Sequence, residues 1–371
     1  MTLALRELRR QPSRFAVATL ILTLIAVLLM FLGGLLDGLE AGSTGALRQQ
    51  PGDAIVFAEG AEGSFVRSRL PAEVRAAVAE VVGEDRVGGL GSVQLGARLD
   101  GRGPRDLVPV VLFGYELPLA GLPEGGPGFG EAYADDVLRN EGVEVGDVLR
   151  LGPARSEVEV VGFVSDTKYA QQASLWASLD TWRSVLAENR PGARLDGGAV
   201  QALVVQADGE PAAALAERID EATGGVTDSY TIAGAIDALP GVSQQRSTFA
   251  QIIGVTGVIA VVVVALFFAL LTVERTSLYG VLKALGAGTG SIFAGVLLQA
   301  VVVTAAASAV GVGAALLMDA LVPAGSLPFD ATPARLASSV GYLLFAAVVG
   351  VAFSLRRVLR VDPASAIGGA Q

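Results

Sequence analysis

The chain contains no cysteine and no histidine among its 371 residues. These absences exclude disulfides, thiol nucleophiles, metal sites built from thiolates or imidazoles, and histidine acid–base catalysis. Charge is also scarce, because only 17% of the residues are Asp, Glu, Lys or Arg, and the mean hydropathy is +0.55. A composition this apolar is unlike that of an ordinary soluble protein, so the sequence points first to a membrane.

Four uncharged runs are long enough to cross a bilayer, which takes about 20 helical residues. Leu, Val, Ala and Phe dominate the runs and none has an interior proline, so each predicts a continuous transmembrane helix. The first run is longer than the apolar core of a signal peptide, and we interpret it as a retained anchor. The runs are Phe15–Leu36, Phe249–Val273, Ser291–Met318 and Leu336–Leu355.

Positive charge predicts the orientation of these spans. Arginines or lysines occur in residues 1–14, in the short segment 274–290 and in the tail 356–371, whereas the connection Asp319–Pro333 has two Asp and no Lys or Arg. Because short cytoplasmic flanks carry the excess of Lys and Arg, both termini and segment 274–290 are expected in the cytoplasm. The long segment after the first span then lies outside the cell.

The expected fold class is an α-helical membrane protein with four transmembrane helices (1+3) and a large α+β extracytoplasmic domain between helices 1 and 2. The predicted order is an N-terminal approach helix (1–14), a span (15–36), the extracytoplasmic domain (37–248), a span (249–273), a cytoplasmic helix (274–290), a span (291–318), a short external loop (319–335), a span (336–355) and a cytoplasmic tail (356–371).

The external segment is acidic and alternates between strand-like and helix-like stretches. Residues 38–246 hold 31 Asp and Glu against 17 Lys and Arg, a net charge of −14. This charge argues against nucleic acid or anionic lipid headgroups as partners. The alternation of strand-like and helix-like stretches in the external segment predicts an α+β domain with a smaller β-rich insert near residues 130–175. Within that insert, VEVGDVLRLG (143–152) and SEVEVVGFV (156–164) predict a hairpin.

No catalytic constellation stands out in this segment. Asp135 and Asp136 are neighbours that point different ways, so they are interpreted as surface or capping residues. Lys168 has serines nearby, but nothing in the sequence fixes a Ser/Lys geometry. No Gly-rich GxxxxGK[ST] loop occurs, so the chain does not bind ATP through a P-loop. We therefore expect a non-catalytic protein without a cofactor or metal.

The segment between the second and third spans has the pattern of a short amphipathic helix. Leu278, Val281, Leu282 and Leu285 fall at i, i+3, i+4 and i+7, which places them on one apolar face. Gly286 follows, where a left-handed C-cap costs glycine little. Such a helix could rest on the membrane interface or dock a partner, and the pattern alone favours neither.

The residues of this segment resemble a known family. VERTSLYGVLKALGAG (273–288) is similar to the segment after the second span of MacB/FtsX-type ABC transporter permeases, with its R-x-x-x-x-G-x-L-K-A-L-G-A pattern. The tail RRVLRVDPASAI (356–367), the hairpin phrase and the 1+3 arrangement of spans also resemble that family. The matching residues are Arg275, Gly280, Leu282, Lys283, Ala284, Leu285, Gly286 and Ala287.

The resemblance implies a homodimer in the bacterial plasma membrane that engages a separately encoded ABC ATP-binding subunit. It implies an exporter of a lipid or amphipathic compound, or alternatively a protein that transmits ATP-driven motion to an extracellular partner such as a cell-wall hydrolase. A membrane-anchored enzyme with an external site is a third hypothesis, which the missing His and Cys disfavour. The residues expected to couple to the ATPase are Glu274, Arg275, Leu278, Gly280, Val281, Leu282, Lys283, Ala284, Leu285 and Gly286.

The predicted topology can be tested with single cysteines, because the chain has none of its own. In intact cells, a membrane-impermeant maleimide should label Ser64→Cys and Ser326→Cys, which lie in segments expected outside. It should label Ser277→Cys only after the membrane is permeabilised. Labelling of Ser277→Cys from outside would overturn the orientation.

Overall fold

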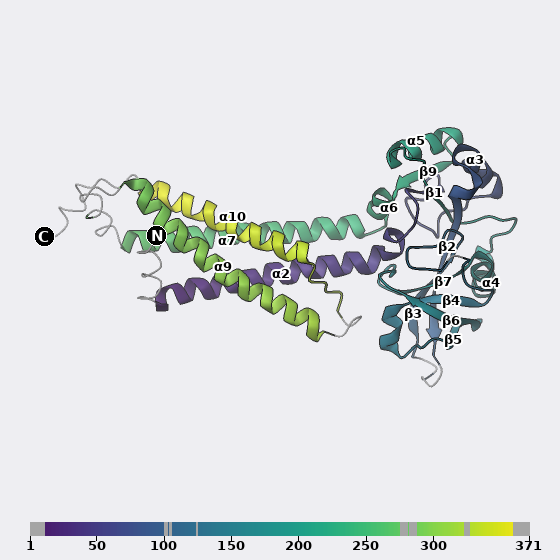
Figure 1. The fold of residues 1–371 in the computed structure, drawn as a ribbon, viewed down its shortest axis with the longest axis horizontal. Coiled ribbons are helices and arrows are strands. Elements are labelled where there is room, and N and C mark those ends of the chain that lie inside the picture. Colours follow the sequence, from purple (N-terminus) through teal and green to yellow (C-terminus); the bar gives the residue numbers. More distant parts are fainter. Residues whose placement is uncertain are drawn as a thin grey trace. The chain divides into compact units, whose positions relative to one another are not determined.

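The computed structural model describes residues 12–99, 103, 106–123, 125–274, 281, 288–322 and 327–358. The chain divides into two compact units. The helical unit comprises residues 1–38 and 246–371, and the sheet unit comprises residues 39–245. Helices α2 (Pro12–Arg48) and α7 (Val242–Glu274) each contribute residues to both units (Figure 1).

The helical unit contains four helices long and apolar enough to cross a membrane, counted over the described residues. They are α2, α7, α9 (Thr289–Leu321) and α10 (Pro333–Val358). In the most apolar window of α7 only 28% of the residues are buried, which leaves most of its side chains for lipid or a further protein surface. The four apolar helices, one before and three after a large α+β domain, confirm the expected fold class.

Small residues bring the helices of this unit together. A Cβ on Gly311 of α9 would lie 3.0 Å from the Cβ of Ala26 on α2, and a Cβ on Gly350 of α10 would lie 2.9 Å from the Val264 side chain on α7. Close backbone approach of this kind is the usual packing mode of helices in lipid.

The residues just before α10 also pack on α2 within the helical unit. Phe329 stacks on Phe31 with ring centroids 6.0 Å apart, and Asp330 donates its backbone N–H to the Gly34 carbonyl at 3.0 Å. At the start of α10, Arg335 forms an ion pair with Asp37. Because Asp37 is largely buried, removing Arg335 would leave its carboxylate without this partner, so loss of either residue is expected to destabilise the contact.

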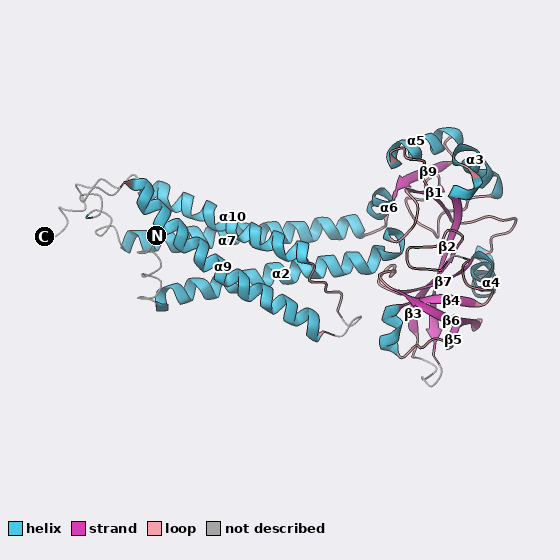
Figure 2. Cartoon of the chain, viewed as in Figure 1, coloured by secondary structure: helices cyan, strands magenta, loops and turns pink. Residues whose placement is uncertain are grey.

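The sheet unit is built on nine strands, counted over the described residues, in the order β3-β7-β4-β6-β5-β2-β8-β1-β9 with an extra β3–β2 pairing. Figure 2 shows these strands with helices around them. In chain order the elements are β1 (Ala54–Ala58), α3 (Ala72–Val82), η1 (Glu84–Arg86), β2 (Val87–Arg98), β3 (Val108–Tyr115), β4 (Glu131–Asp135), η2 (Asp136–Glu141), β5 (Val148–Leu151), β6 (Ser156–Val164), β7 (Ala173–Ser178), α4 (Leu179–Asn189), η3 (Pro191–Ala193), β8 (Ala202–Val205), α5 (Ala212–Ala222), β9 (Thr227–Thr231) and α6 (Ile232–Ala238).

The strand pairings close part of the sheet into a ring. Strand β2 pairs with β3, and the pairing continues through β7, β4, β6 and β5 back to β2. The first half of β2 pairs instead with β8, which continues through β1 to β9 in antiparallel order. The predicted hairpin is confirmed, because β5 and β6 are antiparallel neighbours. The strands expected in the insert near 130–175 belong to the ring.

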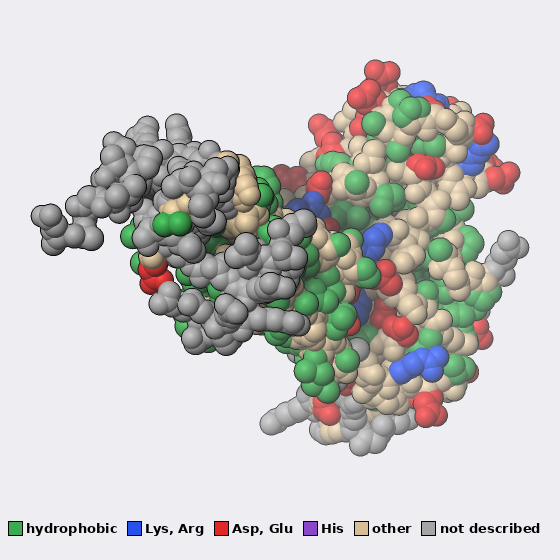
Figure 3. Space-filling model, turned by 60° about the vertical axis from the view of Figure 1, so that its left-hand side comes forward, with side chains coloured by type: hydrophobic (Ala, Val, Ile, Leu, Met, Phe, Trp, Pro, Cys, Tyr) green, Lys and Arg blue, Asp and Glu red, His purple; other side chains and the backbone are tan. Residues whose placement is uncertain are grey.

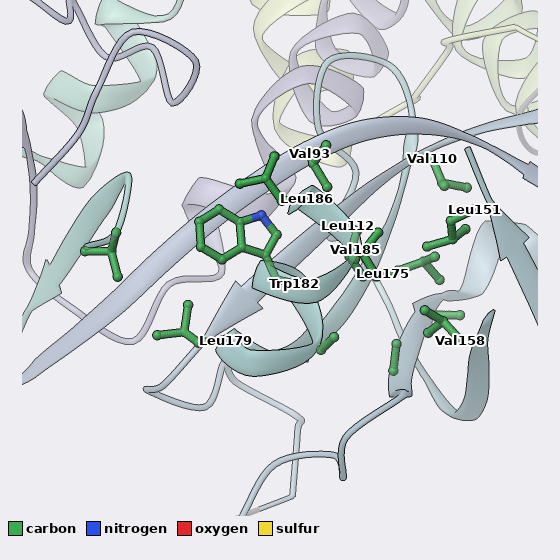
Figure 4. Packing of buried hydrophobic residues seen from close by; sticks show 14 of the residues in the cluster. Val93, Val110, Leu112, Leu151, Val158, Leu175, Leu179, Trp182, Val185 and Leu186 are labelled. Carbon is green, nitrogen blue, oxygen red and sulfur yellow. The ribbon is translucent and has the colours of Figure 1, made fainter. Parts of the chain in front are cut away.

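Two hydrophobic clusters fill the sheet unit. One includes Trp182 of α4 together with Val93, Leu112, Leu175 and Leu186, which lie above and to the right of the Trp182 ring in Figure 4. Glycine at positions 91 and 114 makes room for the Trp182 side chain, because a Cβ at either position would overlap it. The second cluster is rich in aromatic residues and contains Phe57, Phe65, Phe113 and Trp176. Acidic and basic side chains are scattered over the visible surface of this unit (Figure 3).

Candidate functional site: a clasp at the end of helix α2

The last turns of α2 are held by the loop that joins β6 to β7. Within the sheet unit, the Ala46 N–H donates to the Lys168 carbonyl at 3.0 Å, the Ala170 N–H donates to the Ser43 carbonyl at 3.3 Å, and the Gln171 N–H donates to the Gly42 carbonyl at 2.9 Å. We name the pairing of Leu39–Gln49 with Ser165–Gln172 the clasp. Its backbone bonds contribute on the order of 1 kcal/mol each and fix the direction of the helix.

Side chains add a second set of contacts to the clasp. The Gln171 amide donates to the Leu39 carbonyl at 2.6 Å and to the Ser43 hydroxyl at 2.9 Å. Arg48 forms an ion pair with Asp166 at 2.7 Å, but the two side chains are 41% and 49% exposed. Exposed ion pairs contribute about 1 kcal/mol or less, so the backbone bonds and packing hold most of the clasp together.

Two glycines on one face of α2 allow the loop to lie this close. A Cβ on Gly42 would stand 2.6 Å from the Gln171 amide oxygen, and a Cβ on Gly45 would stand 2.7 Å from the Asp166 carbonyl oxygen. Both distances are shorter than a carbon–oxygen contact permits. Their i, i+3 spacing places both glycines on the same side of the helix. Sequence reasoning did not single them out, although a Gly-x-x-Gly pair in a helix is a detectable signal.

Beyond these contacts, the end of α2 is embedded in the aromatic cluster. Ala46 and Leu47 are fully buried and pack in the same cluster as Phe57 and Phe65. Val242, the first residue of α7, is 8% exposed and belongs to that cluster too. The aromatic cluster of the sheet unit therefore contains the end of α2 and the first residue of α7.

A buried hydrogen-bond network holds the loop in its conformation. The Trp176 ring nitrogen donates to the Ser174 hydroxyl at 2.8 Å, which donates to the Thr167 hydroxyl at 2.7 Å, which donates to the Asp135 carboxylate at 2.7 Å. The same carboxylate accepts the backbone N–H groups of Thr167 at 2.9 Å and Val137 at 3.1 Å.

Asp135 is the centre of this network. It is fully buried, and burial raises the pKa of its carboxyl although the hydrogen bonds oppose that shift. Its bond to the Val137 N–H caps η2, which confirms the interpretation of Asp135 as a capping residue. Asp136 is exposed and accepts from Ser165, also in the loop. The two carboxylates serve different partners and form no acid–base pair.

Lys168 and Ser174, noted in the sequence, take structural roles in the clasp and in the network beneath it, respectively. Lys168 contributes its backbone carbonyl to α2, and Ser174 belongs to the buried network. Three of the five non-glycine residues with positive φ, counted over the described residues, lie in this loop: Asp166, Ala170 and Gln171. Such backbone conformations are held in place by surrounding contacts, here those to α2 and Asp135.

Most of the predicted coupling residues lie outside the described residues. Glu274 is the exposed last residue of α7, and Val281 is helical and 58% exposed. The others, Arg275, Leu278, Gly280, Leu282, Lys283, Ala284, Leu285 and Gly286, are not described. The ATPase-coupling role of all ten stays a prediction.

Comparison with known proteins assigns a family to the part of the chain that holds its last three apolar helices. Residues 251–363 match the family model described as FtsX-like permease C-terminal. This part of the chain is an FtsX-like permease domain. It takes in α9 and α10, most of α7 and the segment in which the coupling residues were predicted.

Full-length relatives accompany this match. An uncharacterised ABC transporter permease of Mycobacterium tuberculosis strain H37Rv is 29% identical over 378 residues, which cover 99% of each chain. A putative hemin transport system permease protein, HrtB of Staphylococcus haemolyticus, is 20% identical and covers 100% of this chain and 99% of its own. The periplasmic region of MacB from Actinobacillus actinomycetemcomitans aligns with 53% of this chain and 96% of its own at 11% identity and a TM-score of 0.33.

The Asp135 network predicts a stability change that its neighbour should not reproduce. In wild type, one carboxylate oxygen of Asp135 accepts the Val137 N–H and the other accepts the Thr167 N–H. Asp135→Asn replaces one of these oxygens by an N–H₂ group, which cannot accept, so at least one buried N–H loses its partner. We expect the thermal unfolding midpoint, followed by tryptophan fluorescence, to fall by about 5 °C. Asp136→Asn changes the same charge at an exposed position and should stay near wild type. Equal midpoints for the two variants would contradict the role assigned to Asp135.

Proposed function

We propose that this chain is the permease subunit of an ABC transporter, in which a separate ATP-binding subunit drives movement of the sheet unit outside the cell. The observation that carries the proposal is that α2 is one unbroken helix from Pro12 to Arg48 whose end is fixed in the clasp. A helix of this length spans about 55 Å. In this proposal, movement of its membrane-crossing part is passed along the helix to the clasp.

Helix α7 is the second helix that contributes residues to both units. It runs from Val242 to Glu274, and only Leu239–Gly241 separate it from α6. Its first residue is buried in the aromatic cluster and its last residue adjoins the predicted docking segment 275–287. A partner that presses on that segment would act on α7 and α9 directly, because both end beside it.

The relatives support the identity of that partner. Proteins named ABC transporter permease align with this chain over 99% of both lengths. A permease of that class works with an ATP-binding subunit, and this chain has no P-loop sequence of its own. We propose that the ATP-binding subunit docks through the ten residues predicted between Glu274 and Gly286, with both termini of this chain in the cytoplasm.

An amphipathic compound or lipid is the substrate class we propose for export from the bacterial cell membrane. Two relatives are named putative hemin transport system permease proteins, and hemin is an amphipathic molecule. A homodimer is the proposed assembly, since exposed apolar side chains run along α2 and α7, including Leu20, Leu24, Val258 and Leu266. Stimulation of ATP hydrolysis by amphiphiles, rather than by cell-wall hydrolases, separates export from mechanical signalling to an extracellular partner.

Docking at the cytoplasmic segment can be tested by co-purification with the ATP-binding subunit. Leu282→Asp and Leu285→Asp place a charge on the predicted apolar face, so each should reduce recovery of the ATP-binding subunit by about tenfold or more. The measurement is the ratio of the two chains after affinity purification from membranes.

Val145→Asp is the matched control. Val145 is 60% exposed in the sheet unit, far in sequence from the docking segment, so the same new charge should leave co-purification unchanged. Normal recovery with both leucine variants would refute docking at this segment. A loss with Val145→Asp as well would show that the effect is not specific to the segment.

A further inference from the structure

The sheet unit contains a cavity of about 480 Å³ where its two hydrophobic clusters meet. Val93 and Leu186, on one side, belong to the cluster around Trp182 and lie beside each other in Figure 4. Phe65 and Leu239, on the other side, belong to the aromatic cluster. A volume of this size is that of a small-molecule site.

The cavity lies against a stretch of β2 that lacks a neighbouring strand on one edge. The pairing of β2 with β8 ends at Leu90, and its pairing with β5 begins at Ala97. Side chains take the place of the missing strand. The Ser92 N–H donates to the Gln201 amide oxygen at 2.6 Å, and Arg190 donates to the Gln94 carbonyl at 3.0 Å. Residues 92 and 94 are about 7 Å apart along a strand, which brings Arg190 and Gln201 close together.

The charge and the hydrogen-bond donors of the cavity lining favour an anionic ligand group. Its lining residues include no Asp or Glu, although residues 38–246 carry a net charge of −14. Arg190 lines it and forms no ion pair with any described carboxylate. With its carbonyl oxygen already used, Gln201 has an amide group left to donate, since its nitrogen has no bond among the described residues.

Tyr169 adds a third donor to the lining. Its ring packs edge-on against Phe65 and Phe113, at centroid distances of 5.8 and 5.5 Å, while its hydroxyl has no hydrogen bond among the described residues. Burial raises the pKa of this phenol, so it remains protonated and able to donate.

We propose that this cavity binds an amphiphile with one anionic head group, held by Arg190, Tyr169 and Gln201, and an apolar body packed against Phe65, Val93 and Leu186. Hydrogen bonds to a carboxylate would satisfy the Tyr169 hydroxyl and the Gln201 amide nitrogen, which have no partner among the described residues. Arg190, which already donates to the Gln94 carbonyl, would add a charge-assisted bond through its other N–H groups. An apolar body would cover the side chains that the two clusters leave facing the cavity. The exposed Val66 extends the apolar lining to the surface.

The site can be probed in the full chain through its own fluorescence. Both tryptophans of the chain, Trp176 and Trp182, lie in the sheet unit, so quenching of tryptophan fluorescence reports on this unit. Trp176 stacks on Phe113 at 4.5 Å between centroids, and Phe113 contacts the cavity-lining Tyr169. A bromine atom in the cavity would therefore lie close enough to quench.

The experiment titrates the full chain, in phosphatidylcholine nanodiscs, with 11-bromoundecanoate and with the uncharged 11-bromoundecanol. The carboxylate should quench saturably, and the alcohol should bind about tenfold more weakly. Arg190→Gln should weaken carboxylate binding about tenfold without affecting the alcohol, and Arg190→Lys should restore part of it. Val66→Asp, at a position that is 77% exposed and tolerates a charge, should weaken carboxylate binding as well.

Arg194→Gln is the matched control, because Arg194 is exposed, pairs with Asp196 and does not line the cavity. It should bind the carboxylate as the wild type does. Absence of saturable quenching, equal binding of acid and alcohol, or equal affinities for Arg190→Gln and Arg194→Gln would each overturn the proposal. This measurement needs no ATP-binding subunit, so its failure would leave the docking proposal standing, and failed docking would leave this site standing.

Discussion

The three backbone hydrogen bonds between the end of α2 and the β6–β7 loop are the contact on which the rest of the account depends. They depend on Gly45, where a Cβ would meet the loop backbone, and on the loop conformation that Asp135 holds by hydrogen bonds to Thr167. Because these bonds join main chain to main chain, turning or sliding of the helix would break them unless the loop moved with it. The last turns of α2 therefore belong to the sheet unit, whereas its first part belongs to the helical unit.

Much of the fold could be predicted from the sequence because its signals are local. Uncharged runs gave the four spans, and period-2 alternation gave the β5–β6 hairpin. Helix α2 nevertheless continues to Arg48, beyond the predicted end of its span at Leu36. Hydropathy marks where the hydrocarbon ends, whereas a helix continues as long as its backbone bonds persist, and residues such as Glu40 and Thr44 do not interrupt it. The ring closure could not be foreseen, since β3–β7 and β4–β6 pair strands far apart in the chain.

The candidate site was harder to predict, because it contains no motif of reactive or charged side chains that a sequence would reveal. The clasp works through main-chain atoms and two glycines, and the cavity collects residues from α2, β2, α4, α7 and several loops. Side chains that attract notice in a sequence, such as Lys168, contribute here through the backbone. Asp135 and Asp136 were interpreted as surface or capping residues, and the structure has Asp135 as a cap and Asp136 at the surface, but the sequence gives no sign that Asp135 is fully buried. The coupling residues follow from periodicity and family resemblance, and they stay a prediction.

The most direct test of force transmission through the clasp is a distance measurement between spin labels on the sheet units of two copies. Ala76→Cys places one label per chain on an exposed face of α3. In the complex with the ATP-binding subunit, the account predicts that bound ATP shifts the label–label distance. It also predicts that Gly45→Leu, which forces the loop away from α2, abolishes the shift while the complex still assembles. An unchanged distance in the wild type, or the same shift in Gly45→Leu, would contradict it.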